Sequence, residues 1–177
     1  MMTLVIGGSG SGKSAFAEKI SVELGGQSNK YYLATMKVYD KEIQQKVERH
    51  RRLRSKKGFL TIEQPIRIQK ALEKMEAGSR IALLECISNL TANEMFAEGE
   101  GAAANEVAQT VVQGITLLKE QTTHLVVVTN NVFEDGTIYD EATMAYIRAM
   151  GSINQKLAAL ADRMVEVIAG IPIMIKQ

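Results

Sequence analysis

The chain has 177 residues and a formal net charge of +1. This length suffices for one domain with a substantial core, and we expect a single catalytic domain over residues 1–177. A charge near zero gives no global field that would favour nucleic acid or a membrane surface, and no apolar run approaches the length of a membrane span. Because Cys86 is the one cysteine, no internal disulfide forms, and a reducing cytoplasm is the expected compartment.

Short apolar runs alternate with segments of helical pattern along the chain. Strands are expected at residues 3–6, 31–34, 59–63, 80–86, 124–130, 164–169 and 171–176. Helices are expected at residues 13–24, 40–54, 66–76, 90–96, 105–120 and 140–161. This alternation predicts an α/β fold with a mostly parallel sheet. Pro172 removes a ladder donor, so the last strand is expected as an antiparallel strand on an edge.

A glycine-rich stretch follows the first expected strand. It fits the phosphate-binding pattern G-x-x-x-x-G-K-[ST] and reads Gly7-Gly8-Ser9-Gly10-Ser11-Gly12-Lys13-Ser14. Glycines let backbone N–H groups approach phosphate, and the N-terminus of the next helix faces the same anion. Lys13 is expected on the β- and γ-phosphates and Ser14 on Mg²⁺. A flexible glycine–serine turn is the alternative, but the strand–loop–helix context favours a P-loop NTPase-like, RecA-like three-layer fold that binds nucleotide.

The residues that directly follow each strand are the next candidates, because ligands of parallel sheets lie beyond the carboxyl ends of the strands. Glu85 ends a continuous apolar run. An acid that ends a buried strand beside a P-loop can hold Mg²⁺ or a water bound to it. The alternative is an acid that is exposed where the strand meets solvent. Residues 35–37 and 130–131 follow other strands and are expected at the same end of the sheet.

A basic segment surrounds one of the two histidines. Residues 49–57 hold six cations and no acid, and Ile43, Val47, His50 and Arg54 recur at helical spacing on one face. Three interpretations stay open from the residues alone. The segment is a solvated basic helix end, or it binds nucleic acid, or His50 is a nucleophile that faces a nucleotide phosphate.

Taken together, these motifs resemble a known family. The stretches that carry the resemblance are residues 7–14, 34–35, 40–42, 50–54, 83–87, 128–130 and 151–162. The sequence is similar to the bifunctional adenosylcobinamide kinase / adenosylcobinamide-phosphate guanylyltransferase family of cobalamin biosynthesis. The combination of the P-loop with His50 and the Asn154-Gln155 pair makes the resemblance specific, and it covers essentially the whole chain in order.

The resemblance implies two activities with ATP, GTP and Mg²⁺. One phosphorylates adenosylcobinamide; the other transfers GMP from GTP, through a guanylylated histidine matching His50, to adenosylcobinamide phosphate. Further nucleotide contacts are implied at Thr35, Met36, Lys37, Arg51, Arg52, Leu53, Arg54, Glu63 and Glu85. It also implies a homo-oligomer, a trimer, with the corrinoid as small-molecule partner and with neither nucleic acid nor membrane.

Departures from the family pattern keep two alternatives open. The loop at residues 131–136 differs from the usual glycine-containing sequence, and Arg49 and Ser55 flank the histidine segment unusually. The alternatives are a P-loop kinase for another small metabolite, in which His50 is only structural, and a nucleotide-controlled protein whose basic helix docks on nucleic acid.

Four further polar residues are candidates, and structural roles are expected for two of them. His124 precedes a strand and is expected as a surface or edge histidine, and Cys86 is expected as a buried structural thiol. Asn154 and Gln155 lie in a long amphipathic helix, where they either cap a neighbouring loop or reach the ligand.

Overall fold

The computed structural model describes residues 1–37, 55–97, 102–131, 137 and 139–177. Seven strands are described: β1 Met2–Gly7, β2 Asn29–Ala34, β3 Phe59–Glu63, β4 Arg80–Glu85, β5 His124–Asn130, β6 Arg163–Ile168 and β7 Ile171–Lys176. The described α-helices are α1 Lys13–Gly25, α3 Ile87–Met95, α4 Ala104–Gln121 and α5 Glu141–Leu160, and η1 Ile68–Lys74 is a 3₁₀ helix.

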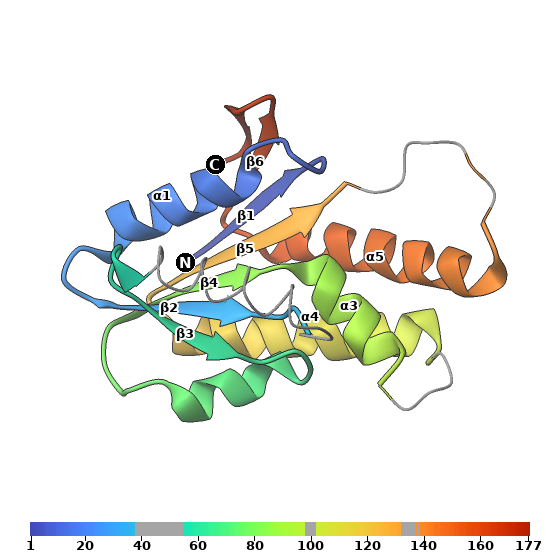
Figure 1. Cartoon of the computed structure of the whole chain (residues 1–177), viewed down its shortest axis with the longest axis horizontal. Coiled ribbons are helices and arrows are strands. Elements are labelled where there is room, and N and C mark those ends of the chain that lie inside the picture. The colour runs from blue at the N-terminus through green and yellow to red at the C-terminus, as the bar shows by residue number, and fades with distance from the viewer. Residues whose placement is uncertain (38–54, 98–101, 132–136, 138) are drawn as a thin grey trace.

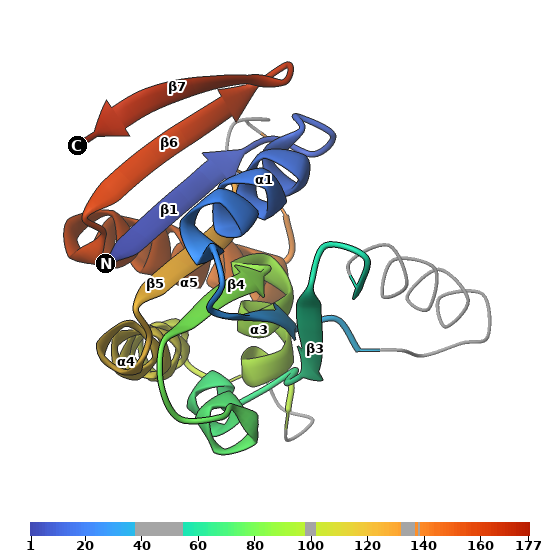
Figure 2. The same ribbon diagram turned by 90° about the vertical axis from the view of Figure 1, so that its left-hand side faces the viewer.

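The strands form one sheet in the order β3-β2-β4-β5-β1-β6-β7 (Figure 1). Neighbouring strands run parallel except β6 and β7, which pair antiparallel. Figure 2 shows β7 at one edge of the sheet, with β6 between it and β1. The expected α/β fold, with its mostly parallel sheet and an antiparallel C-terminal strand on the edge, is therefore confirmed.

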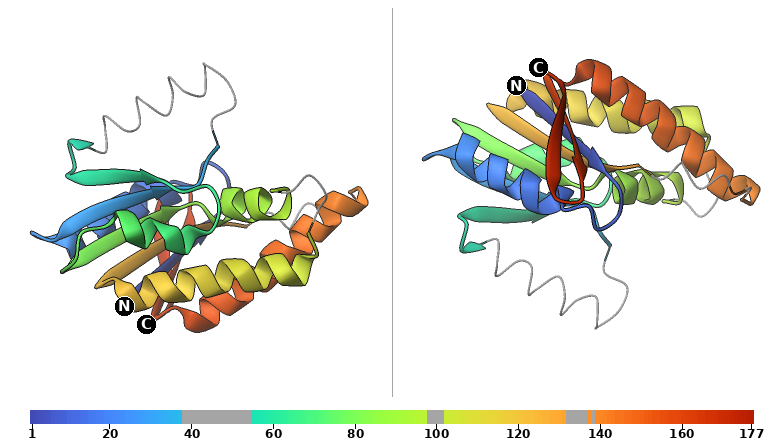
Figure 3. Two further views of the ribbon diagram at one scale, coloured as in Figure 1. Left: turned by 90° about the horizontal axis from the view of Figure 1, so that it is seen from below. Right: turned by 90° about the horizontal axis from the view of Figure 1, so that it is seen from above.

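Helices cover both faces of the sheet (Figure 3). On one face α1 packs over Val5, Leu83 and Val128. On the other face α3, α4, α5 and η1 pack over the alternate strand residues, among them Leu4 and Leu84. Because successive residues of a strand point to opposite faces, each buried central strand contributes to both layers, and its residues read as an unbroken apolar run.

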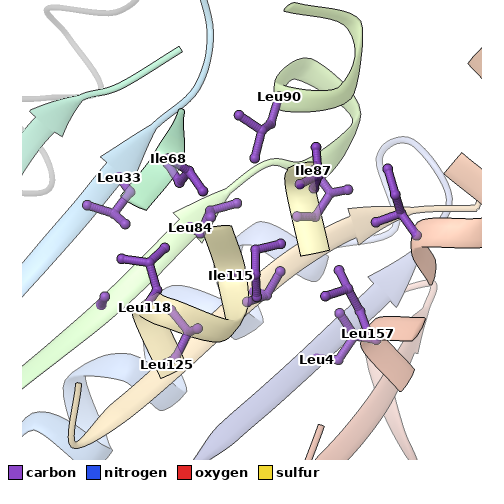
Figure 4. Close-up of a cluster of buried hydrophobic side chains, with 14 of the residues drawn as sticks. Leu4, Leu33, Ile68, Leu84, Ile87, Leu90, Ile115, Leu118, Leu125 and Leu157 are labelled. Carbon is purple, nitrogen blue, oxygen red and sulfur yellow. The ribbon is translucent and has the colours of Figure 1, made fainter. Parts of the chain in front are cut away.

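The larger core lies between the sheet and α4 (Figure 4). Ile115 and Leu118 of α4 are fully buried against Leu84 and Leu125. Gly114 lets η1 come close, since a Cβ atom there would lie 2.8 Å from Cγ2 of Ile68. Burial of this much aliphatic surface is the main stabilising contribution of the fold.

Two of the helices expected from sequence differ in the structure. The expected helix over residues 66–76 is the shorter 3₁₀ helix η1, which begins only after Arg67, because that residue has a left-handed φ of 48° that a right-handed helix cannot contain. The helix expected at 90–96 begins earlier, at Ile87, and its first turn closes with the hydrogen bond from Leu90 N to Cys86 O, 3.2 Å. The helix expected at 40–54 lies outside the described residues.

Candidate active site

The P-loop joins β1 to α1, as the sequence predicted. Strand β1 ends at Gly7, and Gly12 precedes the first residue of α1 with φ 90°. A side chain at Gly12 would be strained by that angle and would place Cβ 3.3 Å from Cα of Gly170. The amide of Gly170 donates to Ser11 O at 2.8 Å, so the β6–β7 turn braces the loop from outside.

Lys13 lies over this loop. Its side chain is buried, and Nζ donates to the carbonyl oxygen of Gly8 at 3.0 Å. The ammonium group is therefore folded back across the glycine-rich turn. The exposed residues Gly8, Ser9 and Gly10 leave the rest of the loop open to such a ligand.

Glu85 faces the P-loop from the end of β4. Oγ of Ser14, in the first turn of α1, donates a hydrogen bond to Oε1 of Glu85. The hydroxyl of Tyr32, on β2, donates to Oε2 at 2.8 Å. Three separate elements thus meet at one carboxylate, and each of its oxygens accepts from a different hydroxyl. The structure brings Ser14 and Glu85 together as the sequence predicted; it adds Tyr32, which the sequence analysis did not single out.

The residues that follow β2 are hydrogen-bonded to the end of β4, where Glu85 lies. Thr35 N donates to Glu85 O at 3.2 Å, while Thr35 Oγ1 donates to Cys86 O at 2.9 Å and accepts from Cys86 N at 2.8 Å. Its hydroxyl therefore braces the two strand ends. The following residues are more accessible: Met36 is exposed and Lys37 is half-buried.

A second polar cluster lies at the carboxyl end of β5, directly beside the P-loop. Asn130 pairs in register with Gly7, and its Nδ2 donates to Ser88 Oγ at 2.8 Å. Asn154 of α5 accepts from Thr129 Oγ1 at 2.7 Å and donates to Asn130 O at 3.2 Å. Asn154 is thus hydrogen-bonded to the end of β5, in line with the capping role expected for it, whereas Gln155 is exposed.

Comparison with known proteins identifies the family to which this site belongs. The model of the family described as "Cobinamide kinase / cobinamide phosphate guanyltransferase" matches residues 3–175. The chain belongs to this family. The resemblance seen in the sequence is therefore confirmed. The predicted function is confirmed too: the protein is a bifunctional cobinamide kinase and cobinamide phosphate guanylyltransferase of adenosylcobalamin biosynthesis.

Several curated relatives match over their full length. "Bifunctional adenosylcobalamin biosynthesis protein CobU" from Escherichia coli is 28% identical, covering 99% of this chain and 100% of the relative. The protein of the same name from Salmonella typhimurium is 29% identical with the same coverage. "Bifunctional adenosylcobalamin biosynthesis protein CobP" from Pseudomonas aeruginosa is 24% identical, covering 99% of this chain and 98% of the relative.

Alignments with solved structures are more distant. One of them, an ATPase domain, aligns with a TM-score of 0.49 at 11% identity, covering 93% of this chain and 68% of that one. The flagellar accessory protein FlaH from Methanocaldococcus jannaschii aligns with a TM-score of 0.47 at 12% identity, covering 99% of this chain and 77% of that one.

The remaining residues expected from the cobinamide kinase / guanyltransferase family fall in two groups. His50, Arg51, Arg52, Leu53 and Arg54 lie outside the described residues. Glu63 is exposed at the carboxyl end of β3, where it pairs in register with Ala34. Because β2 lies between β3 and β4, the backbones of Glu63 and Glu85 are separated by two strand spacings, roughly 10 Å.

A surface hollow of about 540 Å³ also borders Glu63. It lies between Glu63 and Lys74, and Tyr31 and Ile62 line its floor. Both floor residues belong to the core cluster opposite α1. Thr61 and Glu63 line it too and share the sheet face of Phe59, so the hollow lies at the β3 edge of the sheet, and neither Ser14 nor Glu85 lines it.

The other titratable candidates lie apart from the phosphate site or are engaged in structural contacts. His124 begins β5 at the amino end of the sheet, where burial, the N-terminal ammonium and Arg163 lower its pKa. It is half-buried at the start of β5, a central strand, so it lies neither fully on the surface nor on an edge strand as expected. Cys86 is half-buried rather than buried, and its Sγ lies 2.9 Å from Ser88 Oγ.

The donor set around Ser14 fits Mg²⁺. No cluster of three histidine, cysteine or acidic side chains that could cage a metal occurs among the described residues. Mg²⁺ does not require one, because it commonly binds through one or two protein oxygens, with phosphate oxygens and water completing the octahedron. Ser14 and Glu85 offer a hydroxyl and a carboxylate beside the phosphate-binding loop.

Within the described part of the chain, no helix has the length and apolarity needed to cross a bilayer.

Proposed function

We propose that the P-loop binds the nucleoside triphosphate for both reactions of the family. In the first, a hydroxyl of adenosylcobinamide attacks the γ-phosphate of ATP or GTP; the nucleoside diphosphate leaves, and the hydroxyl proton goes to solvent. The observation that carries this proposal is the juxtaposition of Lys13 over the loop with Ser14 and Glu85 at its end. Phosphoryl transfer depends mainly on such positioning and charge stabilisation.

Mg²⁺ is the proposed metal at this site. Ser14 would hold it through its hydroxyl oxygen, and Glu85 would hold the metal or its bound water. When bound, the metal supplies charge neutralisation between the β- and γ-phosphates. Glu85 already accepts the hydrogen bond that the Ser14 hydroxyl donates, which leaves the lone pairs of the hydroxyl oxygen available to a cation.

For the second reaction we propose His50 as the nucleophile. A neutral imidazole nitrogen attacks the α-phosphorus of GTP, the bond to the bridging oxygen breaks, pyrophosphate leaves, and the imidazole loses its N–H proton. A phosphate oxygen of adenosylcobinamide phosphate then displaces the imidazole, which regains a proton, and adenosylcobinamide-GDP is released. Arg51, Arg52 and Arg54 would stabilise the negative charge that develops on the phosphates.

The described residues on either side of this segment support the proposal. Thr35 lies beside Glu85 at the ligand end of the sheet. Lys57 pairs with Glu18 of α1, the helix that carries Ser14. Contacts of Met36, Lys37, Leu53 and Glu63 with the nucleotide belong to the same proposal.

We further propose that the protein acts as a homotrimer in the cytoplasm, with residues 1–177 as one catalytic unit and without nucleic acid or membrane partners. The β6–β7 hairpin supports self-association because it exposes the aliphatic side chains Ile168, Ile171, Ile173, Met174 and Ile175. Exposed apolar side chains gathered on an edge hairpin are typical of interaction sites. Sedimentation equilibrium should give three times the mass of the chain, and a monomer would contradict the proposal.

Incubation with GTP labelled at the α-phosphate tests the covalent step. The wild type should acquire a label that survives alkali and is lost in acid, as a phosphoramidate requires. His50→Ala should acquire none and should retain much of the kinase activity, while the matched control His124→Ala should label normally. Equal labelling of His50→Ala and wild type would overturn the histidine route and leave a P-loop kinase.

A further inference from the structure

We propose that Tyr32 is a positioning residue of the phosphate site, which fixes the Glu85 carboxylate so that its other oxygen faces Ser14. The inference rests on the metal role proposed above for Ser14 and Glu85. Tyr32 lies on β2, and its hydroxyl reaches Glu85 on the neighbouring strand β4.

Strand pairing brings the two residues together. Tyr32 pairs in register with Leu83, and Ala34 pairs with Glu85. Residues two apart on a strand share a face, so the side chains of Leu83 and Glu85 lie on the same side as Tyr32, the side covered by α1. The Tyr32 hydroxyl therefore runs along this face towards the strand end and meets Oε2 of Glu85 at 2.8 Å.

The tyrosine ring is itself held firmly. Tyr32 is 3% exposed, and Phe59 of β3 packs edge-on against it with ring centroids 6.3 Å apart and an interplanar angle of 84°. A buried tyrosine hydroxyl needs a hydrogen-bond partner, and packing leaves this one aimed at the carboxylate. The ring thus packs against Phe59 on β3 while its hydroxyl holds the carboxylate of Glu85.

Two donors on two different oxygens determine the plane of the carboxylate. A carboxyl group at a strand end is free to rotate, but Glu85 accepts from Ser14 on Oε1 and from Tyr32 on Oε2. Each carboxylate oxygen has a second lone pair, so both bonds are compatible with metal-bound water at the same group. Partners of this kind, which orient a group that serves the metal, are commonly needed for full metal affinity.

Tyr31 provides a matched control. It is adjacent in sequence and equally buried, but it faces the opposite core cluster. Its hydroxyl accepts from Glu76 N at 3.0 Å, away from the P-loop. Tyr31→Phe and Tyr32→Phe therefore remove the same atom from neighbouring positions on the two faces of one strand.

The test is the affinity for a fluorescent, non-hydrolysable GTP analogue, measured with MgCl₂ and again with EDTA. We expect the wild type to bind more tightly with Mg²⁺. Tyr32→Phe should lose about tenfold of that Mg²⁺-dependent gain and bind as the wild type does in EDTA, while Tyr31→Phe should retain the full gain. In a Glu85→Gln background, Tyr32→Phe should cause no additional loss, because the group it positions is already neutral.

The outcomes separate this inference from the proposed metal role. A Tyr32→Phe variant that keeps the wild-type gain would overturn the positioning role, and so would equal weakening in MgCl₂ and EDTA, which indicates a general packing defect. A wild type whose affinity does not respond to Mg²⁺ would overturn the metal role itself, and with it the inference. Thermal unfolding of both phenylalanine variants checks that each is folded at the assay temperature.

Discussion

The face of the sheet under α1 is built differently from the face under α3, α4 and α5. In the described part of the chain, the core cluster opposite α1 is extended and lined by aliphatic residues of four helical segments. The cluster under α1 is smaller and includes two aromatic rings, Tyr32 and Phe59. The polar groups of the proposed phosphate site, Lys13, Ser14 and Glu85, lie at the end of the α1 side.

The larger core therefore contributes most to the stability of the fold, whereas the α1 side carries the polar groups of the candidate site. The broad aliphatic core buries enough surface to hold the parallel sheet. The α1 side can then accommodate groups chosen for their hydrogen bonds, such as the tyrosine that reaches Glu85. The two faces therefore predict different consequences for substitutions that look alike in the sequence.

The largest effect is expected at the phosphate site. Lys13→Ala should weaken binding of the triphosphate by at least about a hundredfold and damage both reactions, because it removes the cation that lies over the loop. The free energy of unfolding should change little by comparison. Fluorescence titration with nucleotide and a urea denaturation curve measure the two quantities separately.

Lys19→Ala is the control for charge. Lys19 lies on α1 too, but it is exposed and its contact is with Glu23 one turn along the helix, 3.9 Å away. Its removal should leave nucleotide affinity unchanged within experimental error. Comparable losses in both variants would mean that the net charge of α1, and not the position of Lys13, governs binding.

A smaller effect, on stability, should distinguish the two cores directly. Leu83 and Leu84 are adjacent, and both are fully buried, but they face opposite clusters. We expect Leu84→Ala to lower the free energy of unfolding by about 4 kcal/mol and Leu83→Ala by about 3 kcal/mol, since Leu84 lies in the larger of the two clusters. Leu83→Ala should weaken nucleotide binding more, because Leu83 lies beside Tyr32. Urea unfolding that reversed the order would contradict the proposed division between the faces.

The smallest expected effect concerns Tyr146, on the side of the larger core. Burial, and secondarily the nearby Cys86, raises the pKa of Tyr146 to about 12, from the usual value of about 10. Between those values the native state keeps a proton that the unfolded state loses, so the free energy of unfolding should fall as the pH rises from about 10 towards 12. Tyr146→Phe should show a shallower fall over this range and near-equal stability at pH 8. Identical pH profiles of urea midpoints would contradict the raised pKa.

Local sequence patterns were enough to predict much of the fold. Seven apolar runs were expected as strands, and seven strands are described, in an order that confirms the parallel α/β arrangement. The helix expected over 66–76 is shorter and of the 3₁₀ type, and the pattern of apolar residues gave no sign that Arg67 would take a left-handed conformation and delay its start. The family's histidine segment lies outside the described residues, so the role of His50 stays a prediction.

The P-loop was readable from the sequence because its chemistry depends on eight consecutive residues, whose glycines and lysine are set by local backbone and phosphate geometry. The position of Glu85 at the end of a buried strand, beside Ser14, was also predicted from the sequence. Its partnership with Tyr32 was decided only by tertiary structure, because the two residues are 53 positions apart and meet through the pairing of β2 with β4. No local preference encodes which strands become neighbours; that follows from how the helices bury the two faces of the whole sheet.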